Sequence, residues 1–248
     1  TPEAVTLSCF DPVRRETARL AVSKLVADGR IHPARIEDMV KKAEKEVTEV
    51  IWKSGQEAVM DSGGRGLSPD IIRLMGRLKY RFSYGENVLM HCLEVSHLAG
   101  MLAAEVGADV KIAKAGGFLH DIGKALSHEI EGPHAEIGAD IAKKYNVPSH
   151  VCRCIAEHHD DEMSSPESFI VAAADAITIR FNELFSSDSP TPQGVINLSE
   201  MKLRGVGLSR QKVAYLKDLS SYFHEKIFRP QRLYHMDNEE VIQQLTRV

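Results

Sequence analysis

Helix signals recur along the whole 248-residue chain, and they constrain its fold more than any other feature. Over residues 33–50, apolar residues follow one another at steps of three and four, while lysines and glutamates occupy the other face. Asp11 before Pro12 and Ser68 before Pro69 are typical helix starts, because a capping side chain precedes a proline in the first turn. The period-two alternation of strands is essentially absent. The sequence therefore predicts an all-α fold.

Helix-breaking residues between the helices predict that the chain has three parts. Glycines near residue 66 interrupt the first helical region, and residues 186–192 contain two prolines that cannot continue a helix. We expect an N-terminal helical arm over residues 1–66, a helical domain over 67–185 and a small C-terminal helical segment over 186–248. Helices are expected at about 86–106, 109–120, 133–145, 148–159 and 166–185, from Ser209 to about Phe223, and from Asp237.

Composition limits the partners and the compartment. A formal net charge of -4 gives no overall attraction for nucleic acid, so a polyanion would be held by local patches. No apolar run approaches the ~20 residues that span a bilayer, and the first residues do not form a signal peptide. The four cysteines include no C-x-x-C pair and are expected to be reduced. We therefore expect a soluble, cytoplasmic chain without a transmembrane segment.

The run His-Asp-Ile-Gly-Lys, from His120 to Lys124, indicates metal chemistry. An adjacent histidine and aspartate can offer one imidazole and one carboxylate to the same divalent ion. A single histidine on an apolar helix face is more often a core residue than a ligand, but here five histidines and two aspartates lie at helix ends or on inward faces. Such mixed ligands favour Mn²⁺, Fe²⁺ or Zn²⁺ over Mg²⁺. The candidate ligands are His91, His120, Asp121, His134, His158, His159 and Asp175.

Longer runs give the chain a resemblance to a known family. Residues 29–36, 76–81, 120–124 and 131–134, among others, make roughly residues 1–178 similar to the HD superfamily of metal-dependent phosphohydrolases, and within it to ribonuclease Y. The resemblance implies an HD-domain helical bundle that carries the N-terminal arm and the C-terminal segment. It also implies a membrane anchor, a long coiled coil and an RNA-binding KH domain in full-length relatives, so we expect this chain to bind RNA weakly.

The same resemblance implies roles for the candidate residues. His91, His120, Asp121 and Asp175 match the ligand set of one ion. The remaining histidines, His134, His158 and His159, match positions that hold a second ion in binuclear relatives. His120, Asp121 and Lys124 are the expected catalytic residues, with Lys124 beside the substrate phosphate. We expect one or two divalent ions per chain, with Mn²⁺ as the first choice and Mg²⁺, Fe²⁺ and Zn²⁺ as alternatives.

A basic cluster precedes the helix that carries His91. The cluster consists of Arg77, Lys79 and Arg81, interleaved with the aromatic residues Tyr80, Phe82 and Tyr84. One interpretation is a groove edge that binds an RNA backbone and stacks a base. The other is a solvated helix end with ordinary packing aromatics, and the sequence favours neither.

The chain departs from the ribonuclease Y pattern after Asp175. Residues from about 172 to 248 resemble part of a 3-methyladenine-type DNA glycosylase, but without the helix-hairpin-helix and catalytic aspartate of that family. We therefore expect no base excision. The alternatives are a simple helical cap and a chimeric chain.

Three functions follow from these observations. The first is a metal-dependent endoribonuclease that acts on single-stranded RNA, with homodimer formation left open. The second is an HD phosphodiesterase for a cyclic or small nucleotide. The third is a non-catalytic nucleic-acid-binding or chimeric fragment.

Overall fold

A computed structural model describes residues 4–83, 85–127, 129–185 and 190–225. Within these ranges it contains eleven α-helices, and the all-α prediction is confirmed. The two strands are only two residues long, β1 (Phe82–Ser83) and β2 (Glu86–Asn87), and they pair antiparallel. Among the described residues, no helix has the length and apolarity needed to cross a bilayer. The chain divides into two compact units, Thr1–Asp175 and Ala176–Val248.

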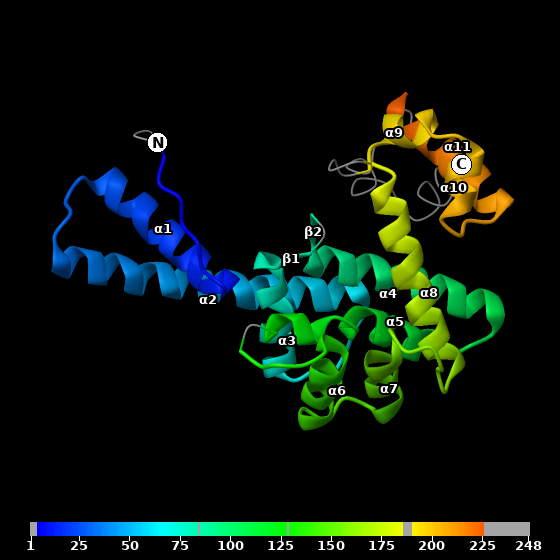
Figure 1. The fold of residues 1–248 in the computed structure, drawn as a ribbon, viewed down its shortest axis with the longest axis horizontal. Helices are drawn as coiled ribbons and strands as arrows, with labels where there is room; N and C mark the ends of the chain where they lie inside the picture. Colours follow the sequence, from blue (N-terminus) through cyan, green and yellow to red (C-terminus); the bar gives the residue numbers. More distant parts are fainter. Residues whose placement is uncertain (1–3, 84, 128, 186–189, 226–248) are drawn as a thin grey trace, which may run out of the picture. The chain divides into compact units, whose positions relative to one another are not determined.

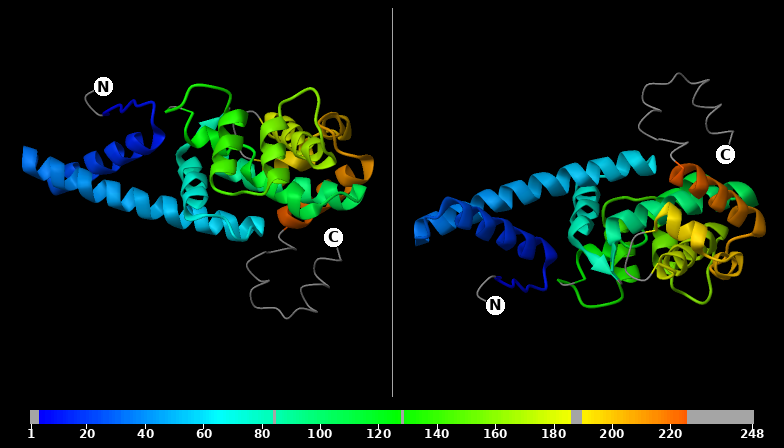
Figure 2. Two further views of the ribbon diagram at one scale, coloured as in Figure 1. Left: turned by 90° about the horizontal axis from the view of Figure 1, so that it is seen from below. Right: turned by 90° about the horizontal axis from the view of Figure 1, so that it is seen from above.

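The first unit begins with a helical hairpin. α1 (Pro12–Asp28) starts at Asp11, whose carboxylate accepts hydrogen bonds from backbone N–H groups of the first turn. Gly29, with a φ of 71°, ends α1 and lets the chain turn into α2 (Pro33–Ser62). α1 then packs back along α2, as Figures 1 and 2 show in blue. These two helices correspond to the predicted arm, whose boundary at residue 66 stays a prediction.

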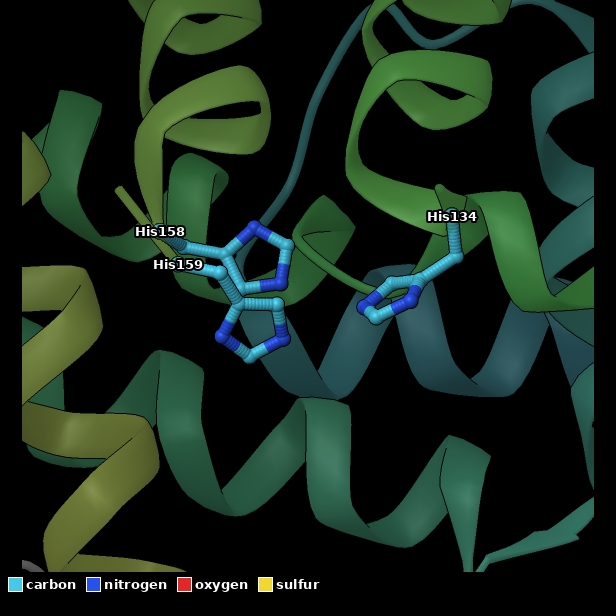
Figure 3. A group of neighbouring side chains, drawn as sticks. All are labelled: His134, His158 and His159. Carbon is cyan, nitrogen blue, oxygen red and sulfur yellow. The ribbon is translucent and has the colours of Figure 1, made fainter. Parts of the chain in front are cut away.

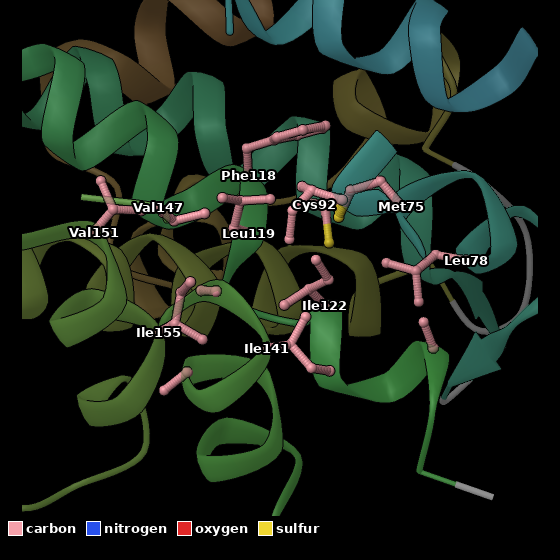
Figure 4. Packing of buried hydrophobic residues seen from close by; sticks show 14 of the residues in the cluster. Met75, Leu78, Cys92, Phe118, Leu119, Ile122, Ile141, Val147, Val151 and Ile155 are labelled. Carbon is pink, nitrogen blue, oxygen red and sulfur yellow. The ribbon is translucent and has the colours of Figure 1, made fainter. Parts of the chain in front are cut away.

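The rest of the first unit is a bundle of short helices. Its largest fully buried side chains include Phe118, Ile71 and Ile122, and Figure 4 shows how residues of this core interlock. Helix pairs in contact include α4 with α5, α6 with α7 and α5 with α7. The predicted helices of this region are confirmed to within about three residues at their ends. The elements are α3 (Pro69–Arg77), η1 (Leu78–Tyr80), α4 (Val88–Val106), α5 (Val110–Leu119), η2 (Ile122–Ala125), α6 (His134–Lys144), α7 (Ser149–Glu157) and the first part of α8 (Pro166–Glu183).

In the part that the structure describes, the second unit contains the rest of α8 and three further helices. These are α9 (Pro192–Asn197), α10 (Glu200–Gly205) and α11 (Arg210–His224). Val195, Leu203 and Val213 are buried within it. The predicted helix from Ser209 is confirmed, since the Ser209 side chain caps α11. The helix predicted from Asp237 lies outside the described residues, and the domain boundary at residue 185 stays a prediction.

Candidate metal centre

Most of the predicted ligands lie where helices begin or end. His91 is in the first turn of α4, and His134 is the first residue of α6. His120 and Asp121 follow α5 directly, in the turn that leads into η2. His158 and His159 follow α7, and Asp175 lies within α8. Side chains that are distant in sequence can therefore meet at one end of the bundle.

A first group of ligand atoms is fully enclosed. His91, His120 and Asp121 are all buried, and each offers an atom within 4.8 Å of the other two. Asp175 joins them, since its Oδ1 lies 2.9 Å from Nε2 of His91 and 3.8 Å from Nε2 of His120. This arrangement brings together the four residues that the resemblance assigned to one ion.

A second group lies beside the first and is more open. Figure 3 shows His134 from α6 facing His158 and His159 at the end of α7. The three imidazoles offer nitrogens within 4.8 Å of one another, with His158 buried and His159 exposed. Asp121 lies between the groups: its Oδ1 is 3.2 Å from Nε2 of His134, and its Oδ2 is 3.5 Å from Nε2 of His120. The structure thus brings all seven predicted ligands together.

Many of the converging atoms have no hydrogen-bond partner among the described residues. Buried polar atoms are rarely left unsatisfied, because losing water without a replacement partner costs about 1–3 kcal/mol. A concentration of such atoms at one point fits a site built for cations, which would satisfy imidazole nitrogens and carboxylate oxygens together. The unsatisfied atoms at the centre are His120 Nε2, Asp121 Oδ1, His134 Nε2, His158 Nε2 and Asp175 Oδ1. Nδ1 of His91 is also unsatisfied but lies on the other side of its ring, toward Glu86.

Hydrogen bonds fix the tautomer of two of the histidines so that Nε2 is free to bind a metal ion. Nδ1 of His120 lies 2.8 Å from the carbonyl oxygen of Gly117, and Nδ1 of His158 lies 2.7 Å from that of Ile155. A carbonyl oxygen can only accept, so Nδ1 of each ring must carry the proton. The lone pair is then on Nε2, which faces the centre. Metal-binding histidines in proteins are commonly oriented by this kind of contact.

The electrostatic environment keeps several ligands unprotonated. Burial lowers the pKa of His158 to about 3, and it also lowers the pKa of His120. Burial would raise the pKa of Asp121, but His120, His134 and Lys124 hold it well below its usual range. At neutral pH these groups are therefore neutral imidazoles and a charged carboxylate, the forms that bind metal.

Two glycines allow the close contacts on which the site depends. Gly117 faces α4 so closely that a Cβ there would lie 3.0 Å from the carbonyl oxygen of Val95, and this contact brings His120 near His91. Gly123 is tighter, since a Cβ would lie 2.0 Å from the carbonyl oxygen of His134. The glycine of the His-Asp-Ile-Gly-Lys run therefore lets η2 lie against the start of α6.

The predicted substrate-binding cations make contacts within the chain. Arg77 donates to Glu129 at 2.6 Å and Arg81 donates to Ser127 at 3.3 Å, so both contact the segment that follows η2. Lys79 donates to Ser54 of α2 at 2.9 Å. Lys124 instead lies within the centre, with its Nζ 2.7 Å from Oδ2 of Asp121. The RNA-binding role of Arg77, Lys79 and Arg81 stays a prediction, and these bonds add a structural role.

The structure also places Glu86, which the sequence analysis missed, beside the centre. Its Oε2 lies 3.6 Å from Nδ1 of His91. An acidic residue near a helix start ordinarily indicates an interaction with the helix dipole, so no sequence signal marked Glu86.

Comparison with known families agrees with this geometry. Residues 88–179 match the HD domain, and this range includes all seven predicted ligands. The chain therefore contains an HD domain over these residues. Its relatives named "Ribonuclease Y" include those of Alkaliphilus metalliredigens, at 58% identity over 179 residues, and Clostridium tetani, at 59% over 179 residues. The recognition of an HD protein similar to ribonuclease Y is confirmed.

The matches to known proteins cover only part of this chain and part of each relative. The two alignments cover 72% of this chain but only 38% and 34% of the relatives, so the chain spans about a third of their length. Among solved structures, the HD domain of the L. monocytogenes phosphodiesterase PgpH matches 56% of this chain, over 92% of its own length, at 18% identity and a TM-score of 0.34. The resemblance of residues 172–248 to a DNA glycosylase stays a prediction.

Proposed function

We propose that this chain carries the catalytic centre of a metal-dependent phosphodiesterase that cleaves single-stranded RNA internally. The observation that carries the proposal is the convergence of five buried nitrogen and oxygen atoms that lack hydrogen-bond partners among the described residues of the HD domain. The identity with proteins named ribonuclease Y supports RNA as the substrate class. Action as a homodimer in the cytoplasm is part of the same proposal.

The seven predicted ligands would hold two divalent ions, for which we propose Mn²⁺. His91, His120 and Asp175 would serve one ion, and His134, His158 and His159 the other. Asp121 would serve both, because one carboxylate oxygen lies beside each group. Bound there, the ions would supply positive charge for the phosphoryl oxygens and acidify a coordinated water.

Lys124 has two roles in this proposal. Its ammonium group holds Oδ2 of Asp121 at 2.7 Å and so fixes the carboxylate that lies between the two groups. The side chain is also 21% exposed, so that a substrate phosphate can reach its remaining N–H donors. Lys124 would then orient one phosphoryl oxygen and offset its negative charge.

Exposure indicates where the substrate enters. His91, His120 and Asp121 are buried, whereas His134 is partly exposed and His159 is exposed. We therefore propose that the scissile phosphate approaches from the side of His134 and His159. An RNA strand is long enough to continue past this opening on both sides, which leaves room for contacts outside the centre.

The test uses the purified chain and a 5′-labelled single-stranded RNA of about 30 nucleotides, with Mn²⁺ or with EDTA. We expect internal cleavage products that require the metal and disappear in His120→Ala and Asp121→Asn. A cyclic dinucleotide is assayed in parallel. The proposal fails if the folded, Mn²⁺-loaded chain leaves RNA intact, and turnover of the cyclic dinucleotide alone would assign a small-nucleotide substrate instead.

A further inference from the structure

The two ring nitrogens of His91 face different carboxylates. Nε2 points to Asp175 at 2.9 Å, on the side where the other predicted ligands converge. Nδ1 is buried, lacks a hydrogen-bond partner within the described structure, and lies 3.6 Å from Oε2 of Glu86. The ring of His91 is therefore between a proposed ligand and a second acid outside the ligand set.

The backbone at Glu86 is held in place by the pairing of two short strands. Glu86 pairs with Ser83 in the β1–β2 hairpin, and the next residue, Asn87, pairs with Phe82. Asn87 caps α4 by accepting from the N–H of Met90 at 3.2 Å, and its amide donates to the carbonyl oxygen of Lys79 at 2.6 Å. The short hairpin thus fixes the backbone from which Glu86 reaches His91.

The other oriented histidines of the centre use backbone atoms for the same purpose. His120 and His158 each place Nδ1 within 2.8 Å of a carbonyl oxygen three residues earlier. At His91 no described backbone carbonyl accepts from Nδ1, and the side-chain carboxylate of Glu86 lies 3.6 Å away, just beyond hydrogen-bond distance. A carboxylate opposite the ligating nitrogen fixes the tautomer and raises the basicity of the imidazole, and removing such a partner commonly weakens metal affinity about 10–100-fold.

We propose that Glu86 is a positioning residue that orients His91, so that Nδ1 carries the proton and Nε2 is available to the metal ion. This inference rests on the proposed metal centre and extends it to a residue outside the ligand set. Glu86 would also add negative charge near the ion held by His91. Its contribution, unlike that of a backbone carbonyl, can be removed by substitution.

A purely structural role for Glu86 makes different predictions. An acid just before α4 would stabilise the helix through its dipole, and its loss would lower thermal stability without changing metal affinity. The variant E86A removes both acceptor and charge, whereas E86Q keeps an oxygen acceptor of the same reach. The variant E37Q removes an equivalent charge from an exposed position on α2 and is the matched control.

The experiment is a calorimetric titration of the full chain and the three variants with Mn²⁺, with helix content checked by circular dichroism. We expect E86A to bind the tighter ion at least about 10-fold more weakly, E86Q to lose less, and E37Q to match the wild type. Histidine ¹⁵N NMR of the Zn²⁺-loaded chain should show the Nδ1–H tautomer of His91 in the wild type and its loss in E86A.

Each outcome decides between the possibilities. Wild-type affinity in both variants at position 86 would overturn the inference, as would wild-type affinity in E86Q if E86A does not fold. A wild-type chain that binds no Mn²⁺ would overturn the proposed function together with this inference. A wild-type chain that binds Mn²⁺ while E86A binds it equally well would overturn the role of Glu86 alone.

Discussion

Replacing Gly123 by alanine should damage the metal centre although it adds only one methyl group. The new Cβ would lie 2.0 Å from the carbonyl oxygen of His134, whereas ordinary contacts begin near 3.4 Å. The backbone at the start of α6 must therefore move by about 1.4 Å. Metal–ligand distances tolerate only about 0.2 Å, so a shift of this size would withdraw His134 from the site.

The expected magnitude follows from the packing. Forcing an extra carbon into a well-packed interior costs about 1–3 kcal/mol, and each kcal/mol lowers Tm by roughly 2–4 °C in a unit of this size. We therefore expect G123A to melt about 2–12 °C below the wild type and to bind fewer Mn²⁺ ions per chain. Melting followed by circular dichroism and a calorimetric Mn²⁺ titration measure these two effects.

A matched substitution separates the steric effect from the loss of glycine itself. Gly205 lies in α10, and a Cβ there would meet nothing within 4 Å. G205A should therefore leave Mn²⁺ binding unchanged and stabilise its helix by up to about 1 kcal/mol. If G123A melts and binds Mn²⁺ like the wild type, the close contact of η2 with α6 does not shape the site.

Three further outcomes are expected. Burial lowers the pKa of His158 to about 3, so the free energy of unfolding of the metal-free chain should fall as the pH drops from about 6.5 toward 3. This group should contribute up to about 1.4 kcal/mol per pH unit to that fall. Chemical denaturation at several pH values should show a flatter slope for His158→Gln, and an unchanged slope would contradict this. Ellman's reagent should modify Cys9 before Cys92, Cys152 and Cys154, because these three thiols are buried. Burial also raises the pKa of Cys154 to about 11, which leaves little of the reactive thiolate. Four equally fast thiols would argue against this packing. If the basic cluster guides RNA, replacing Arg77, Lys79 and Arg81 together should reduce RNA cleavage more than hydrolysis of a small phosphodiester, whereas equal losses would leave only the structural role.

Local features of the fold were predictable because they depend on neighbouring residues. Ser68 accepts a hydrogen bond from the N–H of Ile71, and Asp11 accepts one from Val13, as their positions before a proline predicted. The periodicity after Pro33 likewise predicted α2. Short-range chemistry was therefore sufficient to predict the type and approximate ends of the described helices.

The candidate site was predictable only in part. Helical periodicity indicated that residues such as His91 face inward, but the assignment of ligands to one or two ions came from the resemblance to the HD superfamily. The contact between Gly123 and His134, and the bond from Arg77 to Glu129, depend on how separate helices cross. Spacing along one chain does not determine such crossings, and Glu86 was missed for this reason.

Equilibrium Mn²⁺ binding tests the central claim most directly. Metal content by mass spectrometry and calorimetric titration should give two ions per wild-type chain, one or none in His158→Ala, and greatly weakened binding in Asp121→Asn, since Asp121 faces both groups. A folded wild-type chain that binds no divalent ion would contradict the account, as would variants that keep the wild-type stoichiometry and affinity.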